Sequence, residues 1–179
     1  FTRDEGELHP WTTWPTVHRG VTNKDHKICF INQNIESADE AFPSIWHTLK
    51  NKGVKVGVFG SLQSYTSIID PAYAFYVPDT FSPSDNTWPL KYSAFQRFNL
   101  RQVRQDGAKT QNIKLSSNVI GDVIQMLRSG LRIKTCLALI NHLVHEKINP
   151  WYCSRRAVLQ ALVAFDFFED ALDIYKPEF

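Results

Sequence analysis

The sequence has little of what marks several common protein classes. Its three cysteines, Cys29, Cys136 and Cys153, are widely spaced, and no CxxC pair occurs. Neither a disulfide framework nor a zinc knuckle is expected, and the thiols are predicted to be free and buried. No apolar run reaches the roughly 20 residues that cross a bilayer, so no membrane segment is expected in this chain.

An excess of charge of one sign is also lacking. The chain has 20 basic and 18 acidic side chains, mixed along its length, for a formal net charge of +2. Such a balance gives no field that would attract a nucleic-acid polymer, and none is expected as a partner. A Gly-rich phosphate loop, a GxSxG elbow and an HExxH motif are absent too, so the sequence signatures of those three classes of site are missing.

What is present is enough apolar material for one domain. The chain has 179 residues, of which 43% are apolar and 13% aromatic, and this length supports a real hydrophobic core. It starts at Phe1 rather than at a methionine and stops at Phe179 after Lys-Pro-Glu. It is therefore predicted to be truncated at both ends. The cellular compartment and the oligomeric state stay open.

Local signals predict two strands and a helix in the first half. Residues 42–53 are typical of a short helix, with Pro43 in the first turn and Gly53 as the C-terminal cap. The β-branched residues of 54–59 predict a buried strand directly after it. A second short strand is expected at 73–77. Helix, glycine turn and strand form half of a βαβ unit, which indicates a parallel sheet.

The neighbouring segments are less regular. Pro10 and Pro15 are expected to rule out a continuous helix through residues 7–20. Three prolines and many turn formers predict a long loop at 78–89. Residues 92–105 are predicted to be helical on a mixed pattern.

The carboxy-terminal half is predicted to be helical. Apolar residues recur every four positions from 119 to 131, with Ser116 or Ser117 as the N-cap and a break at Gly130. Ser154 is the predicted N-cap of a last helix. One apolar stripe of that helix comprises Val158, Ala161, Leu162, Phe165, Phe168 and Leu172. We therefore expect a partial α/β core at 1–110 and a helical cap or insertion at 111–179.

Candidate chemistry is concentrated between residues 8 and 26. Thr12, Thr13 and Thr16 offer hydroxyl nucleophiles, which stay inert until a metal or a base lowers their proton affinity. Bases or metal ligands in the same stretch are His9, His18 and His26. The plainer interpretation is that the histidines are hydrogen-bonded fillers and the hydroxyls stabilise turns.

Two further groups are weaker candidates. His142 and His145 share a helix face, but no third metal ligand is evident, and an ordinary helix surface is the preferred interpretation. The carboxylates from Asp166 to Asp173 resemble a cluster, but they are predicted to form the wet side of the last helix.

Several segments, in this order, resemble the alkaline-phosphatase superfamily, and more closely its type I phosphodiesterase/nucleotide pyrophosphatase branch. The first is Thr13-Trp-Pro-Thr-Val-His-Arg-Gly20 followed by Asp25-His-Lys-Ile28. The second runs from Ser44 through Val-Lys-Val-Gly-Val-Phe to Ser61. Segments 76–81, 95–100 and 154–160 are similar to an uncharacterised microbial subgroup of that branch.

The resemblance implies part of a three-layer α/β/α sheet domain with a largely helical cap. It also implies a metal-dependent hydrolase of phosphodiesters or related phosphate esters, acting on a small-molecule substrate. Two divalent ions, expected to be zinc, would activate a threonine that forms a phospho-enzyme. Thr13, which precedes x-Pro, is the implied nucleophile and metal ligand, with Thr16 as the alternative catalytic residue. Most metal ligands would lie outside this segment, so the segment alone is expected to be inactive.

Some positions depart from the family pattern. Arg19-Gly20 stands where the family has Thr-Gly, and His26-Lys27 stands where it has His-Gly. Thr12 or Thr16 could therefore take the place of Thr13, or no hydroxyl could act. Two alternatives follow. One is a non-catalytic protein that keeps the fold and uses the Trp-rich segment for binding. The other is a sulfatase or phosphotransferase of the same superfamily, which the missing Cys-x-Pro-Ser-Arg signature disfavours.

Overall fold

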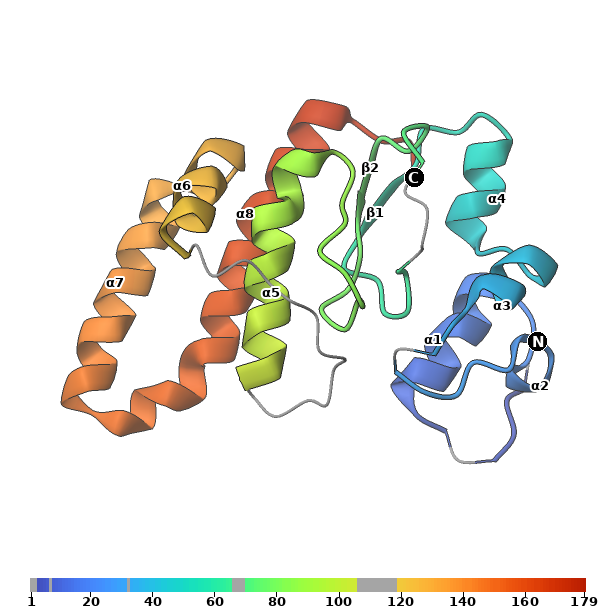
Figure 1. Cartoon of the computed structure of the whole chain (residues 1–179), viewed down its shortest axis with the longest axis horizontal. Helices are drawn as coiled ribbons and strands as arrows, with labels where there is room; N and C mark the ends of the chain where they lie inside the picture. Colours follow the sequence, from blue (N-terminus) through green and yellow to red (C-terminus); the bar gives the residue numbers. More distant parts are fainter. Residues whose placement is uncertain (1–2, 7, 32, 66–69, 106–118) are drawn as a thin grey trace.

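The computed structural model describes residues 3–6, 8–31, 33–65, 70–105 and 119–179. Four short helices come first, then two strands, and then the longer helices (Figure 1). The first part comprises α1 Pro10–Arg19, α2 Asn23–His26, α3 Glu36–Ala41, α4 Ile45–Asn51, β1 Gly57–Phe59 and β2 Phe75–Val77. The second part comprises η1 Leu90–Tyr92, α5 Ser93–Gln105, α6 Val119–Ser129, α7 Ile133–Ile148, η2 Pro150–Arg155 and α8 Arg156–Tyr175.

The prediction of a three-layer α/β/α sheet domain is wrong. The structure is 59% helix and 5% strand, and among the described residues its sheet has only the two parallel strands β1 and β2. Both predicted strands form, but each shortens to three residues, with Gly57 beside Phe75 and Phe59 beside Val77. No other segment of the described part of the chain is a strand, because its remaining apolar residues recur mainly with helical spacing.

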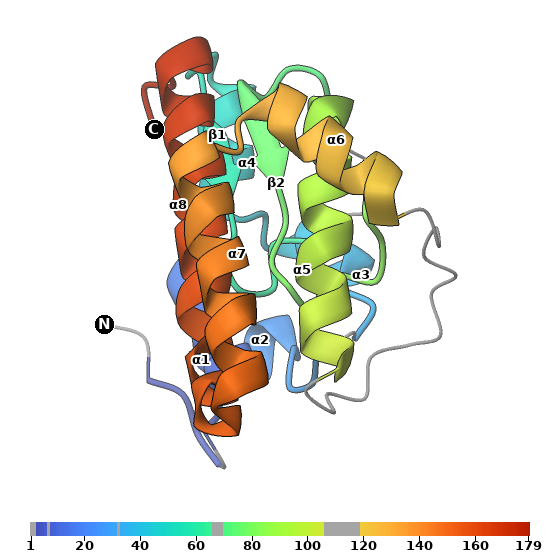
Figure 2. The ribbon, with the colours of Figure 1, turned by 90° about the vertical axis from the view of Figure 1, so that its left-hand side faces the viewer.

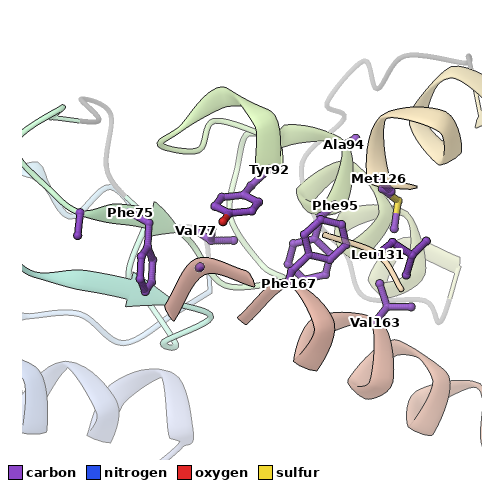
Figure 3. Packing of buried hydrophobic residues seen from close by; sticks show 11 residues of the cluster. Phe75, Val77, Tyr92, Ala94, Phe95, Met126, Leu131, Val163 and Phe167 are labelled. Atoms are coloured by element: carbon purple, nitrogen blue, oxygen red, sulfur yellow. The ribbon is translucent and has the colours of Figure 1, made fainter. Parts of the chain in front are cut away.

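Helices contact both faces of this small sheet. On one face, Phe75 and Val77 join residues of α5 and α8 in the largest core cluster (Figure 3). The ring of Phe167 in α8 stacks on Phe95 of α5 at 4.5 Å between centroids. On the other face, Val58 packs with Trp46 of α4 in a second cluster. The cluster of Figure 3 thus combines residues from both halves of the sequence.

Helix α1 replaces the irregular segment expected at 7–20, so the conclusion drawn from its prolines is wrong. Pro10 is the first helical residue, where no backbone donor is needed, and Gly20 caps the other end in the left-handed region with φ of 68°. Pro15 lies inside the helix and leaves the carbonyl of Trp11 without its usual partner. The side chain of Gln63 lies 3.5 Å from that carbonyl oxygen and donates a long hydrogen bond to it.

The last helix buries a different face from the one predicted. The predicted stripe is exposed along much of its length, whereas Val163, Asp166, Phe167 and Ala171 are buried. Asp166 accepts a hydrogen bond from the backbone N–H of Arg132 at 2.9 Å, so it is not on the wet side of the helix. The helix begins one residue later than a Ser154 cap would give, with Arg155 as the N-cap.

Helices α7 and α8 run antiparallel with α8 next to α5, whereas α6 crosses at an angle and packs on α5 (Figure 2). Gly130 separates α6 from α7, as expected, but Ser116 and Ser117 lie outside the described residues. Arg97 of α5 lies 2.7 Å from Asp122 of α6, which holds these two helices together. None of the described helices is long and apolar enough to cross a membrane.

Candidate functional site

The three candidate threonines lie on α1 in different environments. Thr12 and Thr16 are one helical turn apart on the same face, and both side chains are buried. Thr13 is rotated away from that face and is half-buried. The hydroxyl of Thr12 donates a long hydrogen bond, 3.5 Å, to the carbonyl of Cys29. Helix geometry therefore places the three hydroxyls in different environments.

Thr16 is the centre of a buried hydrogen-bond chain. Its Oγ1 lies 2.7 Å from Oδ1 of Asp4 and 2.9 Å from Nε2 of His26. The Nδ1 atom of His26 accepts the backbone N–H of Ile28 at 3.0 Å, so a neutral ring carries its proton on Nε2. His26 therefore donates to Thr16, and the Thr16 hydroxyl donates to Asp4.

The protonation of His26 agrees with this direction. Burial is the main cause that lowers the pKa of His26, and the nearby positive charge of Arg19 lowers it further. The neutral ring is therefore the form present near pH 7, and its Nε2–H donates a hydrogen bond to the hydroxyl of Thr16. In this arrangement the imidazole is a donor to the hydroxyl and does not accept its proton. The chain His26–Thr16–Asp4 fastens α1 to α2 and to the preceding segment.

Thr13 is the accessible hydroxyl of the three. Its Oγ1 donates to the carbonyl of His9, one turn earlier in the same helix, at 3.2 Å. That carbonyl already accepts the backbone N–H groups of Thr12 and Thr13. The bond is therefore one of several to the same oxygen, and a ligand could replace it at little cost. Thr13 also lies near the amino end of α1, where the helix dipole favours anions.

The three histidines of this stretch do not converge. His9 stacks on Trp11 with ring centroids 5.1 Å apart, and His26 belongs to the Thr16 chain. His18 points elsewhere, with its Nε2 atom 3.0 Å from Oγ of Ser61. Within the described residues no group of three or more His, Cys, Asp or Glu side chains could hold a metal ion. The metal site implied by the resemblance is therefore not formed by these residues.

The pair of Ser61 and His18 was not singled out from the sequence. Ser61 follows β1 directly after Gly60, and the carboxyl ends of parallel strands are where ligand-binding side chains collect in such sheets. The ring of His18 packs edge-on against Trp46 at 4.5 Å. Burial, followed by the charge of Arg19, lowers the pKa of His18 to about 4. The ring is thus neutral at physiological pH and serves as a packed hydrogen-bonding partner.

A cavity of about 440 Å³ opens beside this pair. Trp14, Ile45 and Trp46 line one side of it, and Phe168 and Leu172 of α8 line the other. The outer edge of β1 forms its floor together with Phe179. Its walls are largely apolar, and the two polar side chains of its lining, His18 and Ser61, are bonded to each other.

A second cavity of about 510 Å³ lies between α3, α4 and β2. Arg19 lines this cavity, and its guanidinium donates hydrogen bonds to the carbonyls of Ala38 and Phe42 and to the carboxylate of Asp39. Lys50, also in the lining, is paired with Asp70. Arg19 therefore holds α3 in place.

The remaining candidates have structural partners. His142 is buried 3.5 Å from Glu146, and His145 is exposed and stacks on Tyr152 at 5.2 Å. Cys29 and Cys136 are free but half-buried, not fully buried as expected, and the side chain of Cys153 lies outside the described part. No family profile, curated protein or solved structure matches this chain.

Proposed function

We propose that this chain is part of a hydrolase of phosphodiesters or related phosphate esters, in which the hydroxyl of Thr13 attacks phosphorus. The observation that carries the proposal is the contrast among the three threonines of α1. Thr13 is accessible and bonded only to a carbonyl of its own helix, whereas Thr12 and Thr16 are buried. The order of segments that resembles the type I phosphodiesterases supports the same residue.

The chemistry assigned to this chain is limited to Thr13. Attack by its Oγ1 would form an oxygen–phosphorus bond while the ester oxygen leaves with the bonding pair. Because His26 and Asp4 are already engaged by Thr16, the hydroxyl proton passes to solvent, and the departing oxygen takes up a proton from water. Water would then attack phosphorus in this threonyl ester, release the remaining phosphate ester and restore the hydroxyl.

Divalent ions would supply activation of the hydroxyl and neutralise developing charge. The described residues do not form a site for them beyond the oxygen of Thr13, so no step is assigned to a metal. We expect two ions, with zinc as the expected element, held mainly by side chains other than those described.

The test uses the full-length protein in which this chain occurs. Hydrolysis of bis(p-nitrophenyl) phosphate is measured with zinc or manganese for the parent, Thr13→Ala and Thr13→Ser. The alanine variant should lose at least about 100-fold in rate, as catalytic-group deletions commonly do. The serine variant should retain part of the rate and carry one p-nitrophenyl phosphoryl group in intact-mass spectra after rapid quenching.

Thr16→Val is the matched control, because its hydroxyl is buried in the chain to Asp4. After correction for the folded fraction, it should hydrolyse the diester at the parental rate. Full activity in Thr13→Ala would overturn the assignment of Thr13. Inactivity of the parent toward phosphodiesters, monoesters and sulfate esters would instead favour a non-catalytic binding protein.

That rival function is supported by a separate observation on α1. Trp14 is 48% exposed and Val17 is 70% exposed, so the helix presents large apolar side chains on the side away from Thr16. Exposed aromatic rings of this kind are common in binding surfaces. The two functions use different residues of one helix and can be tested independently.

A further inference from the structure

The cavity of about 510 Å³ between α3, α4 and β2 combines aromatic rings with carboxylates. Its aromatic side chains are Trp46, Tyr65, Tyr73 and Tyr76. The described residues of its lining all fall between Arg19 and Tyr76 in the sequence. In Figure 2, α3 lies on the right and the carboxyl end of the chain on the left, so this cavity is not beside Phe179. Its volume is in the range of small-molecule sites, about 300–1,000 Å³.

The lining of this cavity has more negative than positive charge. Its two cationic side chains, Arg19 and Lys50, are each paired with a carboxylate of the same lining. Glu36 and Glu40, one turn apart on α3, are two further carboxylates, and no salt bridge joins either of them to a described residue. Two cations and four carboxylates leave a formal charge of −2, not counting His47. The cavity therefore favours a positively charged ligand.

Lys50 shows how this cavity holds a cation. Its Nζ atom lies 5.1 Å from the centre of the Tyr73 ring and is paired with Asp70. The side chain of Lys50 is 8% exposed, so a ring and a carboxylate replace most of the water around this ammonium group. Further groups of the same two kinds line the rest of the cavity.

The tyrosines of the cavity are held in place by their hydroxyls. Tyr65 donates to the carbonyl of Gln33, and Tyr76 donates to the carbonyl of Ser64. Burial raises the pKa of Tyr65 and of Tyr73, and nearby carboxylates raise both further. The rings therefore stay neutral near pH 7 and lie in a negative field, a combination that favours a cation beside them.

Ser64 adds an unsatisfied hydrogen-bonding group to the lining. It is 1% exposed, and its Oγ has no hydrogen-bond partner among the described residues. Its main chain is fixed, because the N–H donates to Asp79 at 3.2 Å and the carbonyl accepts from Tyr76. The Oγ atom turns about a single side-chain bond, so a donor in the cavity can draw it into a hydrogen bond. An unpaired buried hydroxyl is costly, which favours a ligand that pairs with it.

We propose that the cavity of about 510 Å³ binds a small organic ammonium compound whose aromatic or apolar body packs on the tyrosine rings. The carboxylates of Glu36 and Glu40 balance its charge, and one of its N–H groups donates to Oγ of Ser64. This inference does not depend on the hydrolase proposed above.

Other small ligands fit this cavity less well. An anion, including a phosphate ester, would meet a negative field, because both cations of the lining are already paired with carboxylates. A neutral apolar compound would contact the rings, but it would gain nothing from the carboxylates and would leave Oγ of Ser64 without a partner.

The experiment titrates the full-length protein with three compounds that differ in the charge of their polar end. They are 2-phenylethylammonium, 2-phenylethanol and phenylacetate, and binding is measured by isothermal titration calorimetry at pH 7 and low salt. We expect the ammonium compound to bind at least about fivefold more tightly than the alcohol. Phenylacetate should show no measurable binding.

Three protein variants locate the site. Glu40→Gln removes one exposed charge from the lining, so the preference for the ammonium compound over the alcohol should fall about threefold while binding of the alcohol stays unchanged. Asp173→Asn is the matched control, because Asp173 is exposed on α8 and does not line this cavity. Ser64→Ala should weaken binding of the ammonium compound at least about threefold without lowering the urea midpoint, since it removes a hydroxyl that has no described partner.

Three results would overturn the proposal. The first is no measurable binding of the ammonium compound. The second is equal binding of the ammonium compound and the alcohol, which would indicate apolar adsorption. The third is binding of the ammonium compound that neither Glu40→Gln nor Ser64→Ala weakens, which would place the cation elsewhere on the protein.

Discussion

Replacing Thr16 with valine removes one hydroxyl from the buried chain that joins α1, α2 and the segment before them. The substitution keeps the shape of the side chain, so packing should change little. It leaves Asp4 with the N–H of Asn23 at 2.9 Å, and it leaves the Nε2 proton of His26 without a partner.

The expected cost follows from those two losses. A hydrogen bond to a charged group contributes about 1.5–3 kcal/mol, and a buried donor left unpaired costs about 1–3 kcal/mol. The two effects overlap because they involve one hydroxyl, so Thr16→Val should lose about 2–4 kcal/mol of unfolding free energy. For a chain of this size that corresponds to a fall in Tm of roughly 5–12 °C.

Thr13→Val provides the matched comparison on the same helix. Its hydroxyl shares the carbonyl of His9 with two backbone donors, and its side chain is half-buried. We expect a change within about 0.5 kcal/mol, as for most surface substitutions. Urea unfolding followed by tryptophan fluorescence gives the midpoint and slope for both variants. Equal destabilisation of the two would refute the assignment of Thr16 as the structural hydroxyl and Thr13 as the free one.

Two further predictions concern the pH dependence and the core. The pKa of His18 is about 4 in the folded protein and 6.5 in the unfolded chain, so the unfolded state takes up the proton first as the pH falls. Stability should therefore drop by about 2–3 kcal/mol between pH 6.5 and 4, and the urea midpoint of His18→Gln should vary less with pH across that window. Phe167→Ala should cost about 3–5 kcal/mol, because Phe167 is fully buried, whereas Phe165→Ala on the exposed side of α8 should cost much less in the same urea assay.

Elements with strong local signals could be predicted from the sequence. The helix expected at 42–53 forms in a shorter version as α4, with Pro43 ahead of its N-cap Ser44 and not in its first turn. Gly53 follows it with φ of 82°, a conformation that favours glycine. The strands at 54–59 and 73–77 form and pair in parallel, as the helix–turn–strand order indicated. The predicted helix at 92–105 is α5. Each of these predictions depends on helix-capping, helix-breaking or β-branched residues that lie within a few positions of one another.

The buried face of α8 could not be read from its sequence, because apolar residues occur on most sides of this helix. The stripe ending at Leu172 satisfied helical periodicity, but so did Val163, Phe167 and Ala171. The choice between them depends on contacts with α5 and with the start of α7, where Arg132 donates to Asp166. The residues that make these contacts are far apart in the sequence, so no local sequence pattern indicates them.

The three candidate threonines were singled out from the sequence but could not be told apart, for a related reason. Thr12, Thr13 and Thr16 have the spacing that places the first and third on one helix face and the second off it. This spacing could not be interpreted as two sides of a helix, because Pro10 and Pro15 were expected to exclude a helix there. The bond from Gln63 to the carbonyl exposed by Pro15 is a tertiary contact, and it shows how the helix accommodates its internal proline.

Helix α1 combines two anchoring contacts with an accessible hydroxyl on another side. Thr16 fastens it to Asp4 and His26, and His18 fastens it to the end of β1 through Ser61. Trp14 lines the cavity of about 440 Å³ beside β1, and Thr13 stays accessible near the amino end of the helix. Thr16→Val should therefore lower the folded fraction and leave hydrolysis per folded molecule unchanged, whereas Thr13→Ala should remove hydrolysis and change stability by no more than about 0.5 kcal/mol. A loss of hydrolysis in Thr16→Val beyond its loss of folded protein would contradict this division of roles.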